Sequence, residues 1–115
     1  MSYMKIRLAI VFLFAGSMLT GCSYDKEVLG PCGSTTVSFA TDIMPLVQTR
    51  CATTNCHASN STNLGGPFTN YSQIKAKATT IRQAVESGVM PQGSSLTQEQ
   101  INKISCWVES GALDN

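Results

Sequence analysis

The run CATTNCH, from Cys51 to His57, constrains this chain of 115 residues more than any other feature. It places two thiols and an imidazole within seven residues, and His57 is the only histidine in the chain. A C-x-x-C-H run is typical of covalent haem attachment, in which the thiols add to the haem vinyls and the histidine ligates iron. Because four residues separate Cys51 from Cys56, the run predicts a haem site with a longer gap than usual.

Three other interpretations of this run stay open at the level of sequence. Cys51 and Cys56 could form a local disulfide and leave His57 as a surface histidine. A structural zinc site usually needs four ligands, and only Cys32 and Cys106 are left to complete a Cys3His set. Nucleophilic Cys–His catalysis is the weakest of the three, because adjacent residues rarely aim at each other and no orienting Asn or Asp pattern is evident.

The first 21 residues read as an export signal. Lys5 and Arg7 precede the apolar run at residues 8–19, LAIVFLFAGSML, which is too short to span a bilayer that needs about 20 apolar residues. The sequence LTGC at residues 19–22 resembles a bacterial lipobox, in which cleavage exposes a cysteine that is then lipidated. We therefore expect Cys22 to carry acyl chains that anchor the protein without spanning the membrane. The alternative is an ordinary signal peptide with Cys22 kept as a thiol.

Charge and cysteine content limit the function classes of the mature chain, residues 22–115. The leader holds two of the eight Lys and Arg residues and none of the seven Asp and Glu residues, so the remainder is close to neutral. Near-neutrality argues against nucleic acid as a partner. Cys32 and Cys106 remain unassigned, and in an oxidising compartment they predict a disulfide, with two unrelated buried thiols as the alternative.

Periodicity and capping signals predict an all-α domain over residues 39–115, preceded by a tether over residues 22–38. A first helix is expected to begin at Thr41 or Asp42 and to run into Cys51. Residues 71–86 predict one helix or two short ones, with Gly88 as the stop. The last helix is the best signalled, since Thr97 and Gln100 form a capping box, Leu96 and Ile101 a hydrophobic staple, and Gly111 the end.

A haem iron bound by His57 needs a second axial ligand, and methionine is the available choice because no second histidine exists. Outside the leader only Met44 and Met90 remain. Met44 lies in the first turn of the first expected helix and would have to fold back. Met90 lies in a loop before Pro91, so it can approach from the far side, and we predict it as the distal ligand. The alternative is a loop methionine that only packs on the domain.

From Phe39 to Asn115 the chain resembles a small class I c-type cytochrome domain, of the type found in exported proteins of Bacteroidetes and planctomycetes. The matching pieces are FATDIMPLVQTRC, the Cys56-His57 pair, the Met-Pro loop and LTQEQINKISCWVESGALDN, which contains the W-x-x-x-G-A pattern of the C-terminal helix. The resemblance implies a small helical domain wrapped around one covalent haem c. The gap between Cys51 and Cys56 departs from the family pattern, and no helix-crossing glycine is evident in the first helix.

Together these features predict a membrane-anchored monohaem cytochrome c that carries single electrons in the cell envelope and is not an enzyme. Its expected partners are envelope redox proteins and, through the lipid, a periplasm-facing membrane, with a mild preference for the outer membrane. No nucleic acid and no small-molecule substrate are expected. The haem-lining candidates are Phe68, Trp107, Ile74, Ile81 and Ile104. The alternative function is a haem-free, disulfide-stapled exported lipoprotein that acts as a binding or scaffold module.

Overall fold

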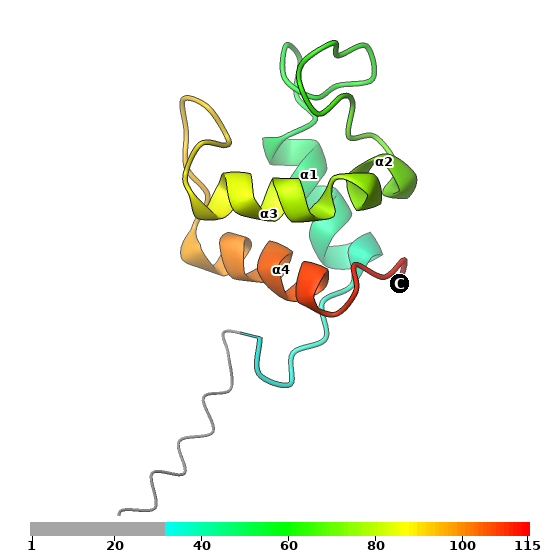
Figure 1. The fold of residues 1–115 in the computed structure, drawn as a ribbon, viewed down its shortest axis with the longest axis vertical. Helices are drawn as coiled ribbons and strands as arrows, with labels where there is room; N and C mark the ends of the chain where they lie inside the picture. The colour runs from blue at the N-terminus through cyan, green and yellow to red at the C-terminus, as the bar shows by residue number, and fades with distance from the viewer. Residues whose placement is uncertain (1–31) are drawn as a thin grey trace, which may run out of the picture.

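The computed structural model describes residues 32–115, which form a domain built from helices (Figure 1). The expected leader and the predicted lipidation site Cys22 lie outside these residues, as does most of the predicted tether. Within the described part there is no β-strand, so the prediction of an all-α domain is confirmed at that level. The elements are η2 (Phe39–Ile43), α1 (Met44–Arg50), α2 (Tyr71–Ala76), α3 (Ala78–Glu86) and α4 (Gln98–Glu109).

The first helical segment begins earlier than predicted. Ser38 is the N-cap and its hydroxyl accepts a hydrogen bond from the backbone N–H of Thr41, while the Asp42 carboxylate accepts one from the N–H of Ser38. Thr41 and Asp42, which we expected as caps, therefore lie within the first turn. That turn, η2, is π-helical and continues into α1, where Pro45 stands near the start and needs no intrahelical donor.

The segment from residue 71 to residue 86 forms two helices, one of the two outcomes that its pattern allowed. Asn70 caps α2 by accepting from the backbone N–H of Gln73. The chain leaves helical geometry at Lys77 and resumes as α3. Gly88 follows the end of α3 with a φ of +75°, which confirms its role as a stop, because a left-handed residue at this position favours glycine.

The last helix, α4, matches its prediction closely. Thr97 and Gln100 form the capping box, with both reciprocal hydrogen bonds present. Gly111 stands just beyond the helix with a φ of +96°. In Figure 1, α4 lies side by side with α3, the two helices pack against each other, and α1 crosses behind them.

The core lies where these helices meet the two ends of the described chain. Phe39 packs against Trp107 at 5.6 Å between ring centroids and edge-on against Tyr71 at 5.0 Å. The Trp107 indole N–H donates to the carbonyl of Leu113, so the C-terminal tail is held against the same cluster. Asn115 in turn accepts from the backbone N–H of Phe39. Val37 is also buried, so the core begins two residues before the expected domain start.

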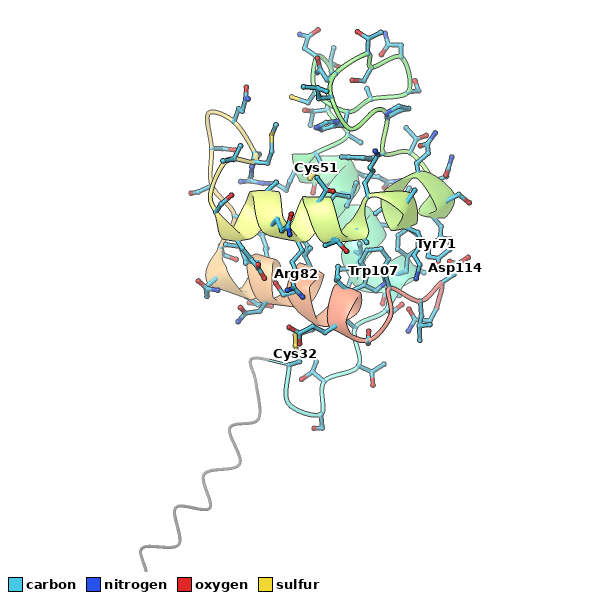
Figure 2. All side chains as sticks on the ribbon, viewed as in Figure 1. Cys32, Cys51, Tyr71, Arg82, Trp107 and Asp114 are labelled. Atoms are coloured by element: carbon cyan, nitrogen blue, oxygen red, sulfur yellow. A yellow bond between two sulfur atoms is a disulfide. The ribbon has the colours of Figure 1, made fainter. Side chains whose placement is uncertain are left out.

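Cys32 and Cys106 are joined by a disulfide in the structure, as the cysteine count predicts. The bond links the start of the described chain to α4, and the two residues are 74 positions apart in sequence. In Figure 2, Cys32 lies below α4 and Cys51 lies above α3, on the other side of this helix pair. The disulfide therefore attaches the start of the described chain to α4, on the other side of α3 from Cys51.

Candidate functional site

The predicted haem-attachment residues and the predicted axial methionine line one pocket of about 490 Å³. Its wall takes Cys51, Cys56 and His57 from the motif, one face of α3, and Met90 from the loop that follows α3. Most of the lining surface is apolar. Cavities of a few hundred Å³ with apolar walls and a few placed polar groups are typical of cofactor sites, so the size fits a bound prosthetic group.

The end of α1 positions the motif. Cys51 is the C-cap of α1, and its backbone N–H still donates to the carbonyl of Val47 at 2.8 Å. The chain then turns back, so that the N–H of His57 donates to the carbonyl of Cys51 at 3.0 Å. The turns of residues 51–57 accommodate the four residues between the two cysteines, and Asn55 has a φ of +68°. The extra residues are thus absorbed in a bulge beside the pocket.

His57 is buried, and one nitrogen of its ring is engaged by the backbone. Nδ1 lies 2.8 Å from the carbonyl oxygen of Gly66. A carbonyl only accepts, so Nδ1 carries the proton and donates it. The other nitrogen, Nε2, then holds a free lone pair, which is the form in which a histidine ligates metal.

Phe68 and Gly65 hold the His57 ring in place. The Phe68 ring stacks on the imidazole with 4.3 Å between centroids and 24° between planes. The backbone N–H of Phe68 also donates to the carbonyl of His57 at 2.9 Å. A methyl group on Gly65 would lie 3.3 Å from Cζ of Phe68, which is tight, and 3.6 Å from Cε1 of His57, which is an ordinary contact. Glycine is favoured here mainly because the φ of this residue is +102°.

Met90 is held at the pocket by its backbone, whose N–H donates to the carbonyl of Ala84 in α3 at 3.1 Å. Its side chain is half-buried and lines the pocket. Met44 is partly buried against the hydrophobic core instead and is not among the pocket-lining residues. Of the two methionines outside the leader, only Met90 therefore faces the site that contains His57.

Both motif cysteines are free thiols in the structure, so the local disulfide considered from the sequence is not formed. Burial raises the pKa of the Cys51 thiol above its usual value of 9.0, and the neighbouring Arg50 charge only partly opposes this effect. Cys51 is therefore a neutral thiol near pH 7. A neutral thiol is a weak nucleophile, which argues against Cys–His catalysis at this position.

A zinc site of the Cys3His type is not supported, because two of its four ligands are not free. The disulfide removes Cys32 and Cys106 from any Cys3His set. Among residues 32–115 there is no group of three or more His, Cys, Asp or Glu side chains placed to hold a metal ion. The pocket wall contains the thiols of Cys51 and Cys56, the imidazole of His57 and the thioether of Met90. A thioether is not among the ligands that zinc usually takes, whereas it is a known ligand of haem iron.

Three of the five residues predicted to line the haem pocket are placed elsewhere. Phe68 and Ile81 do line it. Ile74, Ile104 and Trp107 are almost fully buried in the core shared by the helices and are not among the pocket-lining residues, so they take the other role that their pattern allows, core packing. Helical periodicity marks a side chain as buried without distinguishing the core from a neighbouring cavity, and these three face the core.

Arg50 is a further pocket residue, and its sequence position gave no sign of this role. It lines the pocket beside Cys51, and one Nη nitrogen donates to the carbonyl of Ser95 at 2.7 Å. Lys77 lines the pocket too, and no Asp or Glu does. Two apolar residues of the pocket wall, Leu64 and Val89, are exposed to water, so this end of the domain is open to solvent.

Within residues 32–115 no helix has the length and apolar character that crossing a membrane requires. Comparisons of the chain with protein-family models, with curated proteins and with solved structures found no match.

Proposed function

We propose that this protein is a monohaem c-type cytochrome that carries single electrons in the cell envelope, anchored by lipid on Cys22. The observation that carries the proposal is the convergence of Cys51, Cys56, His57 and Met90 on one pocket. These residues come from two segments separated by α2 and α3, so local sequence proximity does not account for Met90.

Each of these side chains has a distinct role in the proposal. Cys51 and Cys56, both free thiols, would hold the haem through thioether bonds. His57 would ligate iron through Nε2, because Nδ1 is committed to the Gly66 carbonyl. Met90 would supply the second axial ligand. When bound, the haem supplies an iron centre that alternates between the ferric and ferrous states by gaining or losing one electron.

The protein side of this chemistry is orientation and exclusion of water. The Gly66 hydrogen bond and the Phe68 stack fix the plane of the imidazole and strengthen it as a ligand. The apolar face of α3, with Ile81, Ala84 and Val85, lowers the polarity of the site. If His57 and Met90 both bound the iron, no ligand position would be left for a substrate, which favours electron transfer over catalysis.

The position of the disulfide bears on the anchor. Cys32 is bound to Cys106 on the α4 side of the domain, and Cys51 lies beyond α3 (Figure 2). A lipid on Cys22, ten residues earlier in sequence, would thus tether the domain by the end opposite its pocket. The pocket would then face away from the membrane, where envelope redox proteins can reach it.

A spectroelectrochemical titration of the mature protein, made together with cytochrome c maturation proteins, tests the function. The proposal predicts reversible one-electron behaviour, low-spin spectra in both redox states and no binding of carbon monoxide to the reduced form. Rapid carbon monoxide binding would instead indicate a ligand-binding or sensor haem with a labile Met90. A mature protein without any haem would favour a disulfide-stapled binding or scaffold lipoprotein.

A further inference from the structure

We propose that Asn63 positions Cys56 for its bond to haem, by clamping the enlarged gap between the two attachment cysteines. This inference rests on the proposed function and concerns the point at which the chain departs from the usual attachment run. Four residues separate Cys51 from Cys56, so two additional residues must be accommodated before both thiols can reach the same cofactor. A longer gap gives the backbone more conformations, so the position of the second thiol needs a restraint.

The gap ends in a tight turn over residues 53–56. The backbone N–H of Cys56 donates to the carbonyl of Thr53 at 3.0 Å. Asn55 takes the third position of this turn with a φ of +68°, a conformation that asparagine tolerates better than most residues do. The turn brings Cys56 back toward the pocket, and the direction of the Cys56 side chain depends on how firmly the turn is held.

The side chain of Asn63 holds this turn from outside. Its amide nitrogen Nδ2 donates to the carbonyl of Asn55 at 2.9 Å and to the carbonyl of Cys56 at 2.7 Å. A primary amide has two N–H groups, so each carbonyl can have its own hydrogen. The hydroxyl of Ser61 donates to the Cys56 carbonyl as well. One side chain therefore fixes two successive peptide groups directly before His57.

Asn63 is also connected to the histidine. Its backbone carbonyl accepts from the N–H of Gly66 at 2.8 Å, and the carbonyl of Gly66 accepts from Nδ1 of His57. Asn63, Cys56 and His57 all line the pocket. The same residue thus restrains both the thiol that would bind the porphyrin edge and the imidazole that would bind the iron.

The two cysteines are held in different ways. Cys51 ends α1, and its N–H donates to the carbonyl of Val47 within that helix at 2.8 Å. Cys56 is exposed, and its backbone is held by the turn and by Asn63. In the bond at issue, Sγ of Cys56 adds to the inner carbon of a haem vinyl group and the thiol proton goes to the terminal carbon, so nothing is released and no external oxidant or reductant is consumed. Loss of the clamp should weaken attachment at Cys56 and spare Cys51.

The test counts thioether bonds in the mature protein made together with cytochrome c maturation proteins. The holoprotein is unfolded, alkylated and mapped by mass spectrometry, which shows for each cysteine whether it bears haem or a free thiol. In the parent protein both cysteines should be bonded. Asn63→Ala removes two hydrogen bonds, so we expect the ratio of bonded to free Cys56 to fall roughly tenfold while Cys51 stays bonded. Asn63→Asp keeps the size of the side chain but loses both donors, so it should give the same result.

Two further variants separate positioning from stability. Asn70→Ala removes the cap of α2, and Asn70 is not among the pocket-lining residues, so this variant should melt at a lower temperature and keep both thioethers. Deletion of Thr53 and Thr54, both exposed, leaves the run CANCH with the usual gap. In that shortened chain Asn63→Ala should no longer free Cys56.

The outcomes decide between the inference and the function on which it rests. If Asn63→Ala and Asn63→Asp lose the Cys56 bond no more than Asn70→Ala does, the role of Asn63 is refuted while the cytochrome proposal stands. A parent protein bonded to haem through Cys51 alone refutes it in the same way. Equal loss of the Cys56 bond with the long and the short gap also overturns the inference, because the clamp would then not act on the extra residues. If the parent chain bears no covalent haem, both proposals fail.

Discussion

The Nδ1–H of His57 donates to the carbonyl oxygen of Gly66, nine residues further along the chain, at 2.8 Å. This bond fixes the tautomer of the only histidine and leaves Nε2 free beside the pocket. The acceptor is a backbone group, so the bond depends on the path of the loop rather than on a particular side chain. The loop in turn is held by the stack of Phe68 on the imidazole.

Replacing Gly65 tests whether this loop geometry serves the site. Gly65→Ala places a methyl group against Phe68 and His57 at a φ of +102°, so the stack must shift. Gly66→Ala meets the same kind of backbone strain at a φ of +77° but nothing within 4 Å. Each should cost about 1–2 kcal/mol in the free energy of unfolding through the left-handed backbone.

Only Gly65→Ala should also alter the haem spectrum, by displacing His57. Matched thermal melts and visible spectra of the two variants measure the difference. Equal spectra for both would mean that the Gly65 contact has no influence on the ligand.

Met90→Ala should leave haem attached and open the sixth coordination position. The reduced protein should then bind carbon monoxide and lose the charge-transfer band near the red end of the spectrum that marks Met–iron ligation. Met44→Ala is the matched control, because Met44 packs on the core and is not among the pocket-lining residues. That variant should lose some stability and keep the spectrum. An unchanged low-spin spectrum in Met90→Ala would remove Met90 as the ligand.

Loss of the disulfide should lower stability without changing the site. The bond closes a loop of 74 residues and lies on the other side of the α3–α4 pair from Cys51. Closing a loop of this length is worth about 4.4 kcal/mol in the chain-entropy account. Cys32→Ser should therefore lower the free energy of unfolding by about that amount in urea titrations while the haem spectrum is retained. The parent protein should show the same loss in a reducing buffer, whereas Cys32→Ser should be insensitive to it.

Asp42 should make stability depend on pH in the acid range. The backbone N–H of Ser38 lowers the pKa of its carboxyl below the usual 3.8; burial opposes this effect, and Lys103 adds to it. A carboxyl with a lower pKa in the folded state stabilises the fold above its unfolded pKa, and this stability is lost as the pH falls through the folded pKa.

Asp42→Asn should therefore lower stability by about 0.5–1 kcal/mol at pH 7, since the group is partly exposed. The difference should shrink as the pH falls below about 3.8 and through the lower pKa of the folded state, where the parent carboxyl becomes neutral. The measurement is the difference in urea midpoint between the parent protein and Asp42→Asn, determined at pH 7 and again at pH 3. A constant difference at both values would show that the charge of Asp42 plays no part.

The sequence predicted the elements whose signals are local. The capping box of Thr97 and Gln100, and the stops at Gly88 and Gly111, each lie within a few residues of the helix end that they define. The start of the first helix was missed because Ser38 was not considered as a cap and the first turn is π-helical. Capping by Ser38 and the bond from its N–H to Asp42 together move the boundary upstream.

The sequence indicated those parts of the site that consist of reactive side chains. It did not indicate the parts that consist of backbone groups. Cys51, Cys56, His57 and Met90 could be found because thiol, imidazole and thioether are rare groups with defined uses. The Gly66 carbonyl carries no side-chain signal, and its position depends on the whole loop.

The separation of pocket residues from core residues was also beyond the sequence. Trp107 and Ile81 are both buried and apolar, yet only Ile81 lines the pocket. Long-range packing decides this difference, and helical periodicity contains no information on it.

The most direct test of the account is a pyridine haemochrome spectrum of the mature chain, made with cytochrome c maturation proteins and washed in acidified acetone. We predict one haem per chain that stays with the protein, with Cys51→Ala and Cys56→Ala each shifting the α-band as one thioether is lost. Haem that washes away completely, or that never appears although the disulfide-linked domain is folded, would contradict the assignment of this pocket to a covalent haem.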